Sequence, residues 1–308
     1  MVISTQEVFV AYKKMKHYFY HDNTSLFFRR RIALFEKEVA EQIGMEEADF
    51  EGTMRRMAKK LQAISLKEWR AYLEEEINIK VTPKSFKKRP APMITNHSSN
   101  DNPQMARANF FIDAPVDVHV LSVLWLMKVG HILSKDIEPE NFAYRLELFQ
   151  EDEDDQEFHP VVGGLRLYQP YFIQYQNWRD KAILQVERLL EEKKNAVLLS
   201  LDIKDYFHSV KINLIEIRDQ ILSSVKFVKA ERSVIIRLFN LLSAVHDVYS
   251  KKLSAIKGIP ELEDDESILP IGLLSSGLLG NYYLKDFDSA IKDQLNPVLT
   301  FIVFGIVN

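Results

Sequence analysis

Apolar residues near the N-terminus recur with the period of an α-helix. Four of them are spaced by four, three and four positions: Phe50, Met54, Met57 and Leu61. That spacing places their side chains on one helix face, where they can pack into a core. Ser65 followed by Glu68 is a capping-box pattern that predicts the start of a further helix. We therefore expect residues 1–79 to form a helical N-terminal region.

The pattern changes between residues 80 and 109, where Pro, Asn, Ser, Lys and Arg dominate. This composition predicts a long loop or a mobile arm. A buried helix should follow over Val116–Ser134. We expect this apolar run, which Lys128 interrupts, to be too short and too polar to span a membrane. The acidic run at residues 151–157 is typical of a solvated loop.

Helical periodicity returns over residues 171–194. Five apolar residues of this stretch are expected to face inward: Trp178, Ile183, Val186, Leu189 and Leu190. The apolar run at residues 196–201 then predicts a short buried strand that leads directly into Asp202.

Two helices are predicted next, over residues 212–225 and 229–256. Pro270 and Gly272 indicate a tight turn that feeds a long helix. Residues 298–308 are apolar and rich in β-branched and aromatic side chains, which predicts one more buried strand.

The composition narrows the class of protein. The chain has 308 residues, of which 46% are hydrophobic and 27% charged, so it can bury a sizeable core. Its net charge of -4 gives no overall basic field for nucleic acid, although a local basic groove is compatible with it. The absence of cysteine excludes disulfides and cysteine-bound zinc and favours a reducing, cytoplasmic setting. The N-terminus does not read as a signal peptide.

Asp202 is the first candidate for chemistry. A carboxylate at the end of a predicted strand can hold a divalent cation such as Mg²⁺, which prefers oxygen ligands. Phe207 lies five residues further on and could wall a small pocket. The alternative remains open that Asp202 is a turn or capping residue and that Phe207 is a core aromatic.

A second segment adds to this pattern. It contains six residues in a fixed order: Leu269, Pro270, Gly272, Ser276, Leu279 and Asn281. Together with Asp202 and Phe207, this order and spacing resemble the first and second palm motifs of reverse transcriptases. Ile271 stands where that family usually has Gln. Upstream, residues 112–125, 140–146 and 168–183 resemble the fingers of bacterial defence-associated, abortive-infection-like reverse transcriptases.

The resemblance implies an α+β right-hand polymerase fold with mostly helical fingers, an incomplete palm and no thumb. Its expected parts are residues 1–79 as the helical N-terminal region, 80–195 as fingers and 196–308 as palm. The implied function is RNA-directed DNA polymerisation in antiviral defence. The implied partners are an RNA template, a DNA or protein primer and deoxynucleoside triphosphates, with a partner protein as a further option and no membrane.

The resemblance also implies roles for individual residues. Asp202 would bridge two Mg²⁺ (or Mn²⁺) ions, and the carbonyl of Ile203 would add a ligand. Backbone amides near Asp205 and Tyr206 would meet the triphosphate. Phe207 would act as a steric gate against the 2′-hydroxyl of ribonucleotides. Pro270 and Gly272 would flank the nucleotide pocket.

Basic residues are candidates for phosphate contacts. They are Lys87, Lys88, Arg89, Arg107 and Arg145. A solvated loop explains the lysine and arginine cluster equally well. The fingers arginine of the family falls on Phe110, so the triphosphate-binding residue stays unassigned. Tyr171, Tyr175 and Trp178 could stack on nucleic acid, with helical packing as the alternative for Trp178.

The third palm motif, an aromatic residue, any residue and two aspartates, is missing from the sequence. Asp264 and Asp265 precede the predicted turn, and Asp286 and Asp288 fall in the helix after it. We expect either a reading frame lost near Val298, or a fragment, or a catalytically inactive protein that binds RNA or a partner. Untemplated nucleotide addition is a third option for the same palm. The chain as given is not expected to polymerise at a useful rate.

Overall fold

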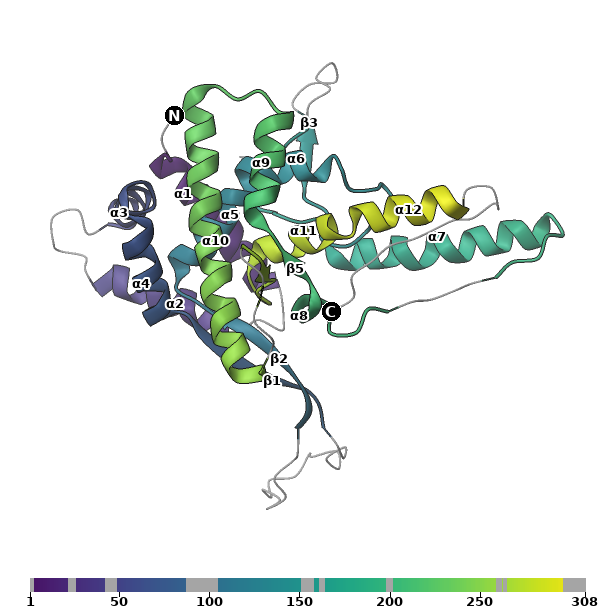
Figure 1. Cartoon of the computed structure of the whole chain (residues 1–308), viewed down its shortest axis with the longest axis horizontal. Coiled ribbons are helices and arrows are strands. Elements are labelled where there is room, and N and C mark those ends of the chain that lie inside the picture. Colours follow the sequence, from purple (N-terminus) through teal and green to yellow (C-terminus); the bar gives the residue numbers. More distant parts are fainter. Residues whose placement is uncertain are drawn as a thin grey trace.

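The computed structural model of this chain describes residues 3–21, 26–41, 49–86, 105–150, 158–160, 164–197, 202–258, 262 and 265–295. These residues form an α+β structure that is dominated by helices (Figure 1). The helices of the first half are α1 Thr5–His21, α2 Leu26–Glu41, α3 Phe50–Ala63, α4 Leu66–Glu76, α5 Val116–Trp125, the π-helical turn η1 Leu126–Gly130 and α6 His131–Ser134. Those of the second half are α7 Tyr171–Glu191, α8 Tyr206–Ser209, α9 Leu214–Ser224, α10 Lys229–Lys257, α11 Leu274–Tyr283 and α12 Lys285–Leu295.

The described strands form three antiparallel pairs of two strands each. The pairs are β1 Asn78–Phe86 with β2 Met105–Asp113, β3 Leu148–Gln150 with β4 Phe158–Pro160, and β5 Lys211–Ile212 with β6 Ser267–Ile268. The second and third pairs are only two or three residues long. The sheet content is therefore small, and helix packing builds the core.

The predicted helical N-terminal region is confirmed. Met54, Met57 and Leu61 are buried along one face of α3, as their spacing predicts. Both halves of the capping box at α4 are present: the Ser65 hydroxyl accepts from the Glu68 amide, and the Glu68 carboxylate accepts from the Ser65 amide.

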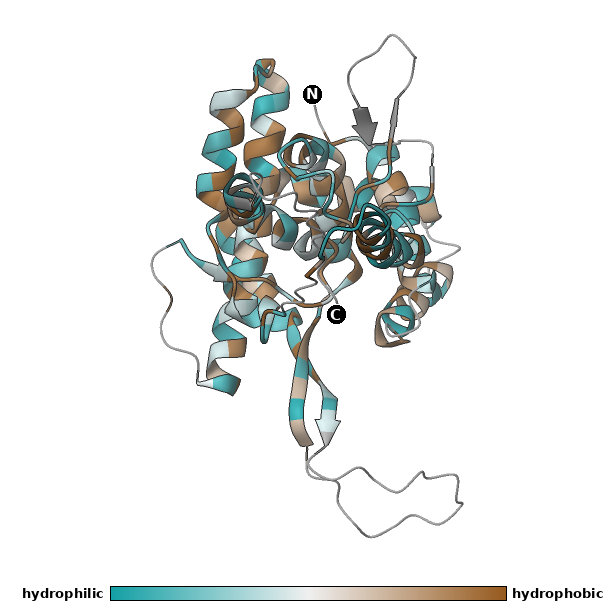
Figure 2. Cartoon of the chain, turned by 90° about the vertical axis from the view of Figure 1, so that its right-hand side faces the viewer, coloured by the Kyte–Doolittle hydropathy of each residue, from teal (hydrophilic) through white to brown (hydrophobic). Residues whose placement is uncertain are grey.

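The predicted loop over residues 80–109 is wrong where the structure describes it. Residues 78–86 and 105–113 pair as an antiparallel hairpin, from Asn78 opposite Asp113 to Phe86 opposite Met105. The hairpin projects from the helical body, as Figures 1 and 2 show. A two-stranded ribbon has only edge strands, so Pro83 and polar residues are tolerated in it, and its register is irregular just after Pro83. Lys87, Lys88 and Arg89 lie outside the described residues.

The predicted buried helix over Val116–Ser134 is confirmed as the continuous run of α5, η1 and α6. By length and apolar composition this run could cross a membrane, contrary to our expectation, but 78% of its most apolar window is buried inside the protein. A core helix passes the same test.

The Trp69 indole N–H donates to the Leu241 carbonyl at 3.0 Å, which ties α4 to α10 beside α5.

One hydrophobic core joins the three predicted parts of the chain. It includes Ile3 and Leu73 of the N-terminal region, Leu124 of the expected fingers, and Leu242 and Leu279 of the expected palm. The boundaries at residues 79 and 195 remain predictions about sequence segments.

The helix predicted over residues 171–194 is present as α7, but its predicted inward face is only partly borne out, since Trp178, Val186 and Leu189 are half-buried rather than buried. None of its residues is buried, and α7 extends away from the core in Figure 1. Ile183 and Leu190 are 46% and 58% exposed. The amphipathic pattern is therefore real, but its apolar side is only partly covered.

The C-terminal half agrees with the remaining helix predictions. α9 and α10 match the two predicted helices, and α11 follows the turn at Gly272, whose φ of 94° is in the left-handed region that favours glycine. The predicted long helix is interrupted at Leu284, between α11 and α12. Most of the strand predicted at 196–201, the acidic run at 151–157 and the strand predicted at 298–308 lie outside the described residues.

Candidate functional site

Asp202 lies on the surface, in an irregular segment that leads into α8. The side chains of Asp202 and Ile203 are exposed, and no described residue is bonded to the Asp202 carboxylate. Asp205 adopts φ 53° and ψ 37°, the left-handed conformation that aspartate tolerates better than most residues. Its carbonyl accepts the His208 and Ser209 amides at 2.9 and 3.1 Å. Asp205 therefore turns the chain from the Asp202 segment into α8.

Tyr206 anchors this segment to α11. Its hydroxyl donates to the Gly280 carbonyl at 2.6 Å, and its side chain is buried. Burial raises the pKa of Tyr206, and the nearby Tyr283 and Asp288 raise it further, so the hydroxyl remains a donor at neutral pH. The sequence expectation gave Tyr206 a backbone role, whereas the structure shows a side chain that packs.

The strand pair β5–β6 brings the two motif segments together a second time. Lys211 lies opposite Ile268 in this pair, and Ile268 immediately precedes Leu269 and Pro270. The Ser250 hydroxyl of α10 accepts the Ile268 amide at 2.8 Å, which fixes β6 against the long helix. Although about 70 residues separate the motif segments in sequence, they form adjoining parts of one structure.

Strand β2 of the hairpin contacts the turn after β6. Ile271 forms a parallel bridge with Phe111, and its carbonyl accepts the Ile112 amide at 2.8 Å. A Cβ atom at Gly272 would lie 2.5 Å from the Phe28 ring, closer than any side chain could remain. Pro270 is buried. Glycine is therefore required here both by its φ and by the close approach of α2.

The matched residues beyond the turn are buried in α11. They are Ser276, Leu279 and Asn281. The Asn281 side chain donates to the Ala143 carbonyl, and a Cβ atom at Gly277 would lie 2.3 Å from the Tyr144 ring. In the described structure these positions serve close packing of α11 against residues 141–144.

Phe207 is half-buried and packs against the core. Its ring centroid lies 5.6 Å from that of Tyr206, with the rings nearly perpendicular. The structure thus gives Phe207 the packing role that was left open for it. The Phe207 side chain is also partly exposed, so the gate role remains a prediction.

Sequence reasoning missed a small cluster beside Phe207. The His208 ring lies 5.5 Å from the Phe110 ring, and the Lys257 ammonium lies 3.5 Å from His208 Nδ1 and 5.1 Å from the centre of the Phe110 ring. Burial, followed by Lys257, lowers the pKa of His208 to about 4, so the imidazole is neutral at physiological pH. The resemblance would place the fingers arginine at Phe110, and the Lys257 ammonium of α10 lies over this ring. No sequence spacing links Lys257 to Phe110.

The basic candidates separate in the structure. The Arg145 guanidinium donates to the carbonyls of Ile137 and Glu138 at 3.4 and 3.1 Å, and burial lowers its pKa. Its hydrogen bonds serve the fold. Arg107 is exposed on β2, opposite Ser85 and next along the ribbon from the exposed Lys84. Of the two described candidates, Arg107 is the one open to a phosphate backbone.

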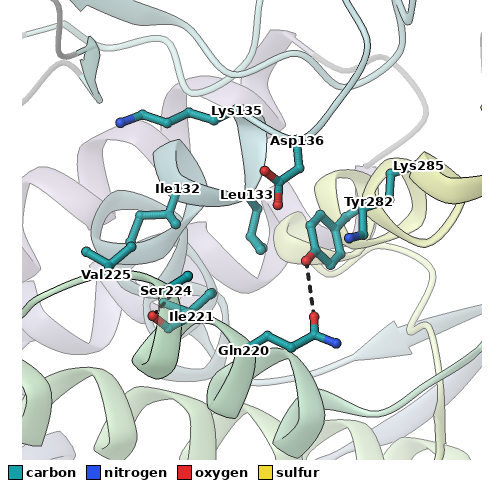
Figure 3. A pocket seen from close by; sticks show the side chains of 10 residues that line it. All are labelled: Ile132, Leu133, Lys135, Asp136, Gln220, Ile221, Ser224, Val225, Tyr282 and Lys285. Atoms are coloured by element: carbon teal, nitrogen blue, oxygen red, sulfur yellow. Dashed lines mark hydrogen bonds between the residues drawn. The ribbon is translucent and has the colours of Figure 1, made fainter. Parts of the chain in front are cut away.

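A cavity of about 300 Å³ lies elsewhere, among α6, α9 and the junction of α11 and α12 (Figure 3). Its apolar wall includes Ile132, Ile221 and Val225, and the Tyr282 hydroxyl donates to Gln220 at 3.4 Å across one side. None of the predicted site residues lines it.

The resemblance implies a site for two Mg²⁺ ions at Asp202 and the carbonyl of Ile203. Among the described parts of the chain, no three side chains of His, Cys, Asp or Glu gather as they would around a metal ion. Asp202 and the carbonyl of Ile203 do not by themselves make up a two-metal site, which needs several carboxylates. The described residues therefore do not by themselves make up such a site.

Comparison with known proteins adds no relative, since no family model, curated protein or solved structure matches the chain. The resemblance to reverse transcriptases rests on the motif residues named above.

Proposed function

We propose that the chain is a protein of the reverse-transcriptase type, an RNA-directed DNA polymerase of antiviral defence. Its substrates would be an RNA template, a DNA or protein primer and deoxynucleoside triphosphates, with Mg²⁺ or Mn²⁺ as cofactor. The observation that carries the proposal is the meeting of the two motif segments. The Tyr206–Gly280 hydrogen bond and the β5–β6 pair hold the segment after Asp202 against the segment that begins at Leu269.

A third segment supports the same reading. Ile112 and Pro115 belong to the stretch that resembles the fingers, and the Ile112 amide donates to Ile271 in the turn of the second motif. Three stretches chosen by motif thus share one neighbourhood. This proximity supports the proposal.

The test is a primer-extension assay on the purified chain with RNA template, DNA primer, deoxynucleotides and Mg²⁺ or Mn²⁺. Asp202→Ala is the test variant. Asp286→Ala is its control, because Asp286 is a 91% exposed acid on α12 that forms only a surface ion pair. We expect weak extension at most, since one carboxylate does not offset two metal ions and each ~1.4 kcal/mol of barrier is tenfold in rate. Any extension should depend on Asp202 and not on Asp286.

If extension is too weak to detect, nucleotide binding can be measured instead. A deoxynucleotide with Mg²⁺ should raise the melting temperature of the chain and of Asp286→Ala more than that of Asp202→Ala. Extension that survives Asp202→Ala would contradict the assignment, and so would the absence of both extension and nucleotide-dependent stabilisation. Sequencing products made with and without RNA separates templated synthesis from untemplated addition.

A second candidate is a catalytically inactive protein that binds RNA. The β1–β2 hairpin favours it, because three exposed cations lie along this projecting ribbon: Lys80, Lys84 and Arg107. Each phosphate contact that is lost should flatten the salt dependence of RNA binding by about one unit of slope. Lys84→Ala and Arg107→Ala should do so, while Lys37→Ala on α2 should not. RNA binding with these properties and no effect of deoxynucleotides would favour this candidate over the polymerase.

A further inference from the structure

Helix α7 carries an apolar face none of whose residues is buried. Side chains at helical spacing form it: Tyr171, Tyr175, Trp178, Ala182, Val186 and Leu189, flanked by Phe172, Ile183 and Leu190. All of them are exposed or half-exposed. Below, this set is called the α7 face. A contiguous apolar surface of this kind marks a docking site.

We infer that the α7 face is the docking surface for residues 298–307 of the same chain, lying along it as an extended segment. This stretch, VLTFIVFGIV, has no charged residue and eight large apolar side chains, and it is rich in β-branched and aromatic types. A stretch of this composition gains free energy by leaving water, and so does the α7 face.

The connection to α12 favours this occupant. α12 ends at Leu295, and only Asn296 and Pro297 separate it from residue 298. Pro297 lacks the amide that a continuing helix needs. α7 and α12 both extend from the core toward the same side of the molecule (Figure 1). A two-residue tether gives the segment a high effective concentration there, which a second copy or a separate partner lacks.

The lengths also agree. A helix of 21 residues such as α7 is roughly 31 Å long at about 1.5 Å per residue. Ten extended residues span about 33 Å at roughly 3.3 Å each. Ten extended residues are therefore about as long as the α7 face.

The chain has no cysteine, so introduced pairs report proximity without background. Ile302→Cys is combined with Tyr175→Cys, Ile183→Cys or Leu190→Cys on the α7 face. The control combines Ile302→Cys with Leu184→Cys, which is 61% exposed on the opposite side of α7. A short bis-maleimide crosslinker tolerates small errors in register, whereas a disulfide does not.

We expect crosslinks within one molecule for at least one α7-face pair, at least about tenfold more than for the Leu184 control. Crosslinks mainly between molecules would assign the face to a second copy and overturn the inference. Equal yields for face and control pairs, or none, would overturn it as well.

Hydrogen exchange gives a second measurement on the unmodified chain. Amides of residues 298–307 should be protected, and Ile183→Asp should raise their exchange at least about tenfold, while the matched Leu184→Asp should not. Both positions are exposed on the same helix, so neither variant removes a buried contact. Unprotected amides in the parent chain, or the same response to both variants, would contradict the docking.

Discussion

The hydroxyl of Tyr206 donates a 2.6 Å hydrogen bond to the carbonyl oxygen of Gly280, across 74 residues of sequence. Tyr206 follows Asp202 by four residues, and Gly280 lies in α11, directly behind the Pro270–Gly272 turn. The bond is buried. It therefore holds the two motif segments at a fixed distance whatever their chemistry.

Tyr206→Phe should lower the free energy of unfolding by about 1–2 kcal/mol, because the buried Gly280 carbonyl loses a partner while the ring stays in place. Urea unfolding followed by circular dichroism measures this. Tyr283→Phe is the control. Tyr283 is an exposed residue of α11, the helix that contains Gly280, and this variant should stay within about 0.5 kcal/mol of the parent. Equal stability of Tyr206→Phe and the control would show that the bond does not hold the segments together.

Gly272→Ala should be strongly destabilising, by roughly 3 kcal/mol or more, because it adds a clash to an unfavourable backbone conformation. Gly258→Ala separates the two effects. Gly258 also has positive φ, at 64°, but nothing lies within 4 Å of its Cβ position, so it should cost only about 1 kcal/mol. Thermal unfolding of both variants gives the comparison. Similar losses for the two would mean that α2 yields to the added methyl group.

The helices of this fold were predictable where one face is buried. The periodicity of α3 and the capping box of α4 report directly on local structure, and the largely apolar α5 is buried along its whole length. The hairpin β1–β2 was not predictable in this way. Its residues are those of a loop, and pairing between edge strands depends on a partner about 30 positions away.

Contacts between distant segments were predictable only through the motifs. Periodicity identified the apolar side of α7 but could not say what covers it. Lys257 beside His208 and Phe110 is beyond any local pattern, because the three residues come from three elements. The motif order did anticipate that the segments containing the two motifs would be in contact, as they are through Tyr206–Gly280 and the β5–β6 pair.

Phe207 gives a prediction that depends on the proposed polymerase. In an active form of the protein, Phe207→Ala should relax the preference for deoxynucleotides, because the ring no longer clashes with a 2′-hydroxyl. Phe207→Tyr keeps the ring and should keep the preference. The measurement is the ratio of incorporation rates for the two nucleotide types. An unchanged ratio in Phe207→Ala would leave Phe207 with its packing role beside Tyr206.

Asp288 provides a test of stability against pH. Its side chain is 1% exposed on α12, Oδ2 accepts from Asn141 at 3.4 Å, and Oδ1 has no partner among the described residues. Burial raises the pKa of Asp288 from 3.8 to about 6, against a lowering by Asn141 and with a small further rise from Glu138. The folded chain therefore holds this proton more tightly than the unfolded chain does.

The direction in which stability changes with pH follows from the number of protons that Asp288 binds in the folded and unfolded states. Between about pH 4 and pH 6 the folded state carries the proton and the unfolded state has lost it, so stability falls as pH rises through this window. Above about pH 6 both states are ionised at Asp288, and the loss levels off. Two pKa units correspond to about 2.7 kcal/mol, which is an upper value for one buried carboxylate. Asp288→Asn cannot ionise and can still accept from Asn141.

Asp288→Asn should therefore be more stable than the parent chain at pH 7, by up to about 2–3 kcal/mol, with the difference shrinking to near zero by about pH 4. Urea unfolding of both chains at half-unit steps from pH 4 to pH 7.5 gives the difference in their free energies of unfolding. The other titrating groups are the same in both chains, so their contributions cancel. Asp286→Asn, the exposed neighbour on the same helix, should follow the parent within about 0.5 kcal/mol at every pH. Parallel curves for the parent and Asp288→Asn would mean that Asp288 is solvated in solution, and that the first turn of α12 does not pack on Asn141.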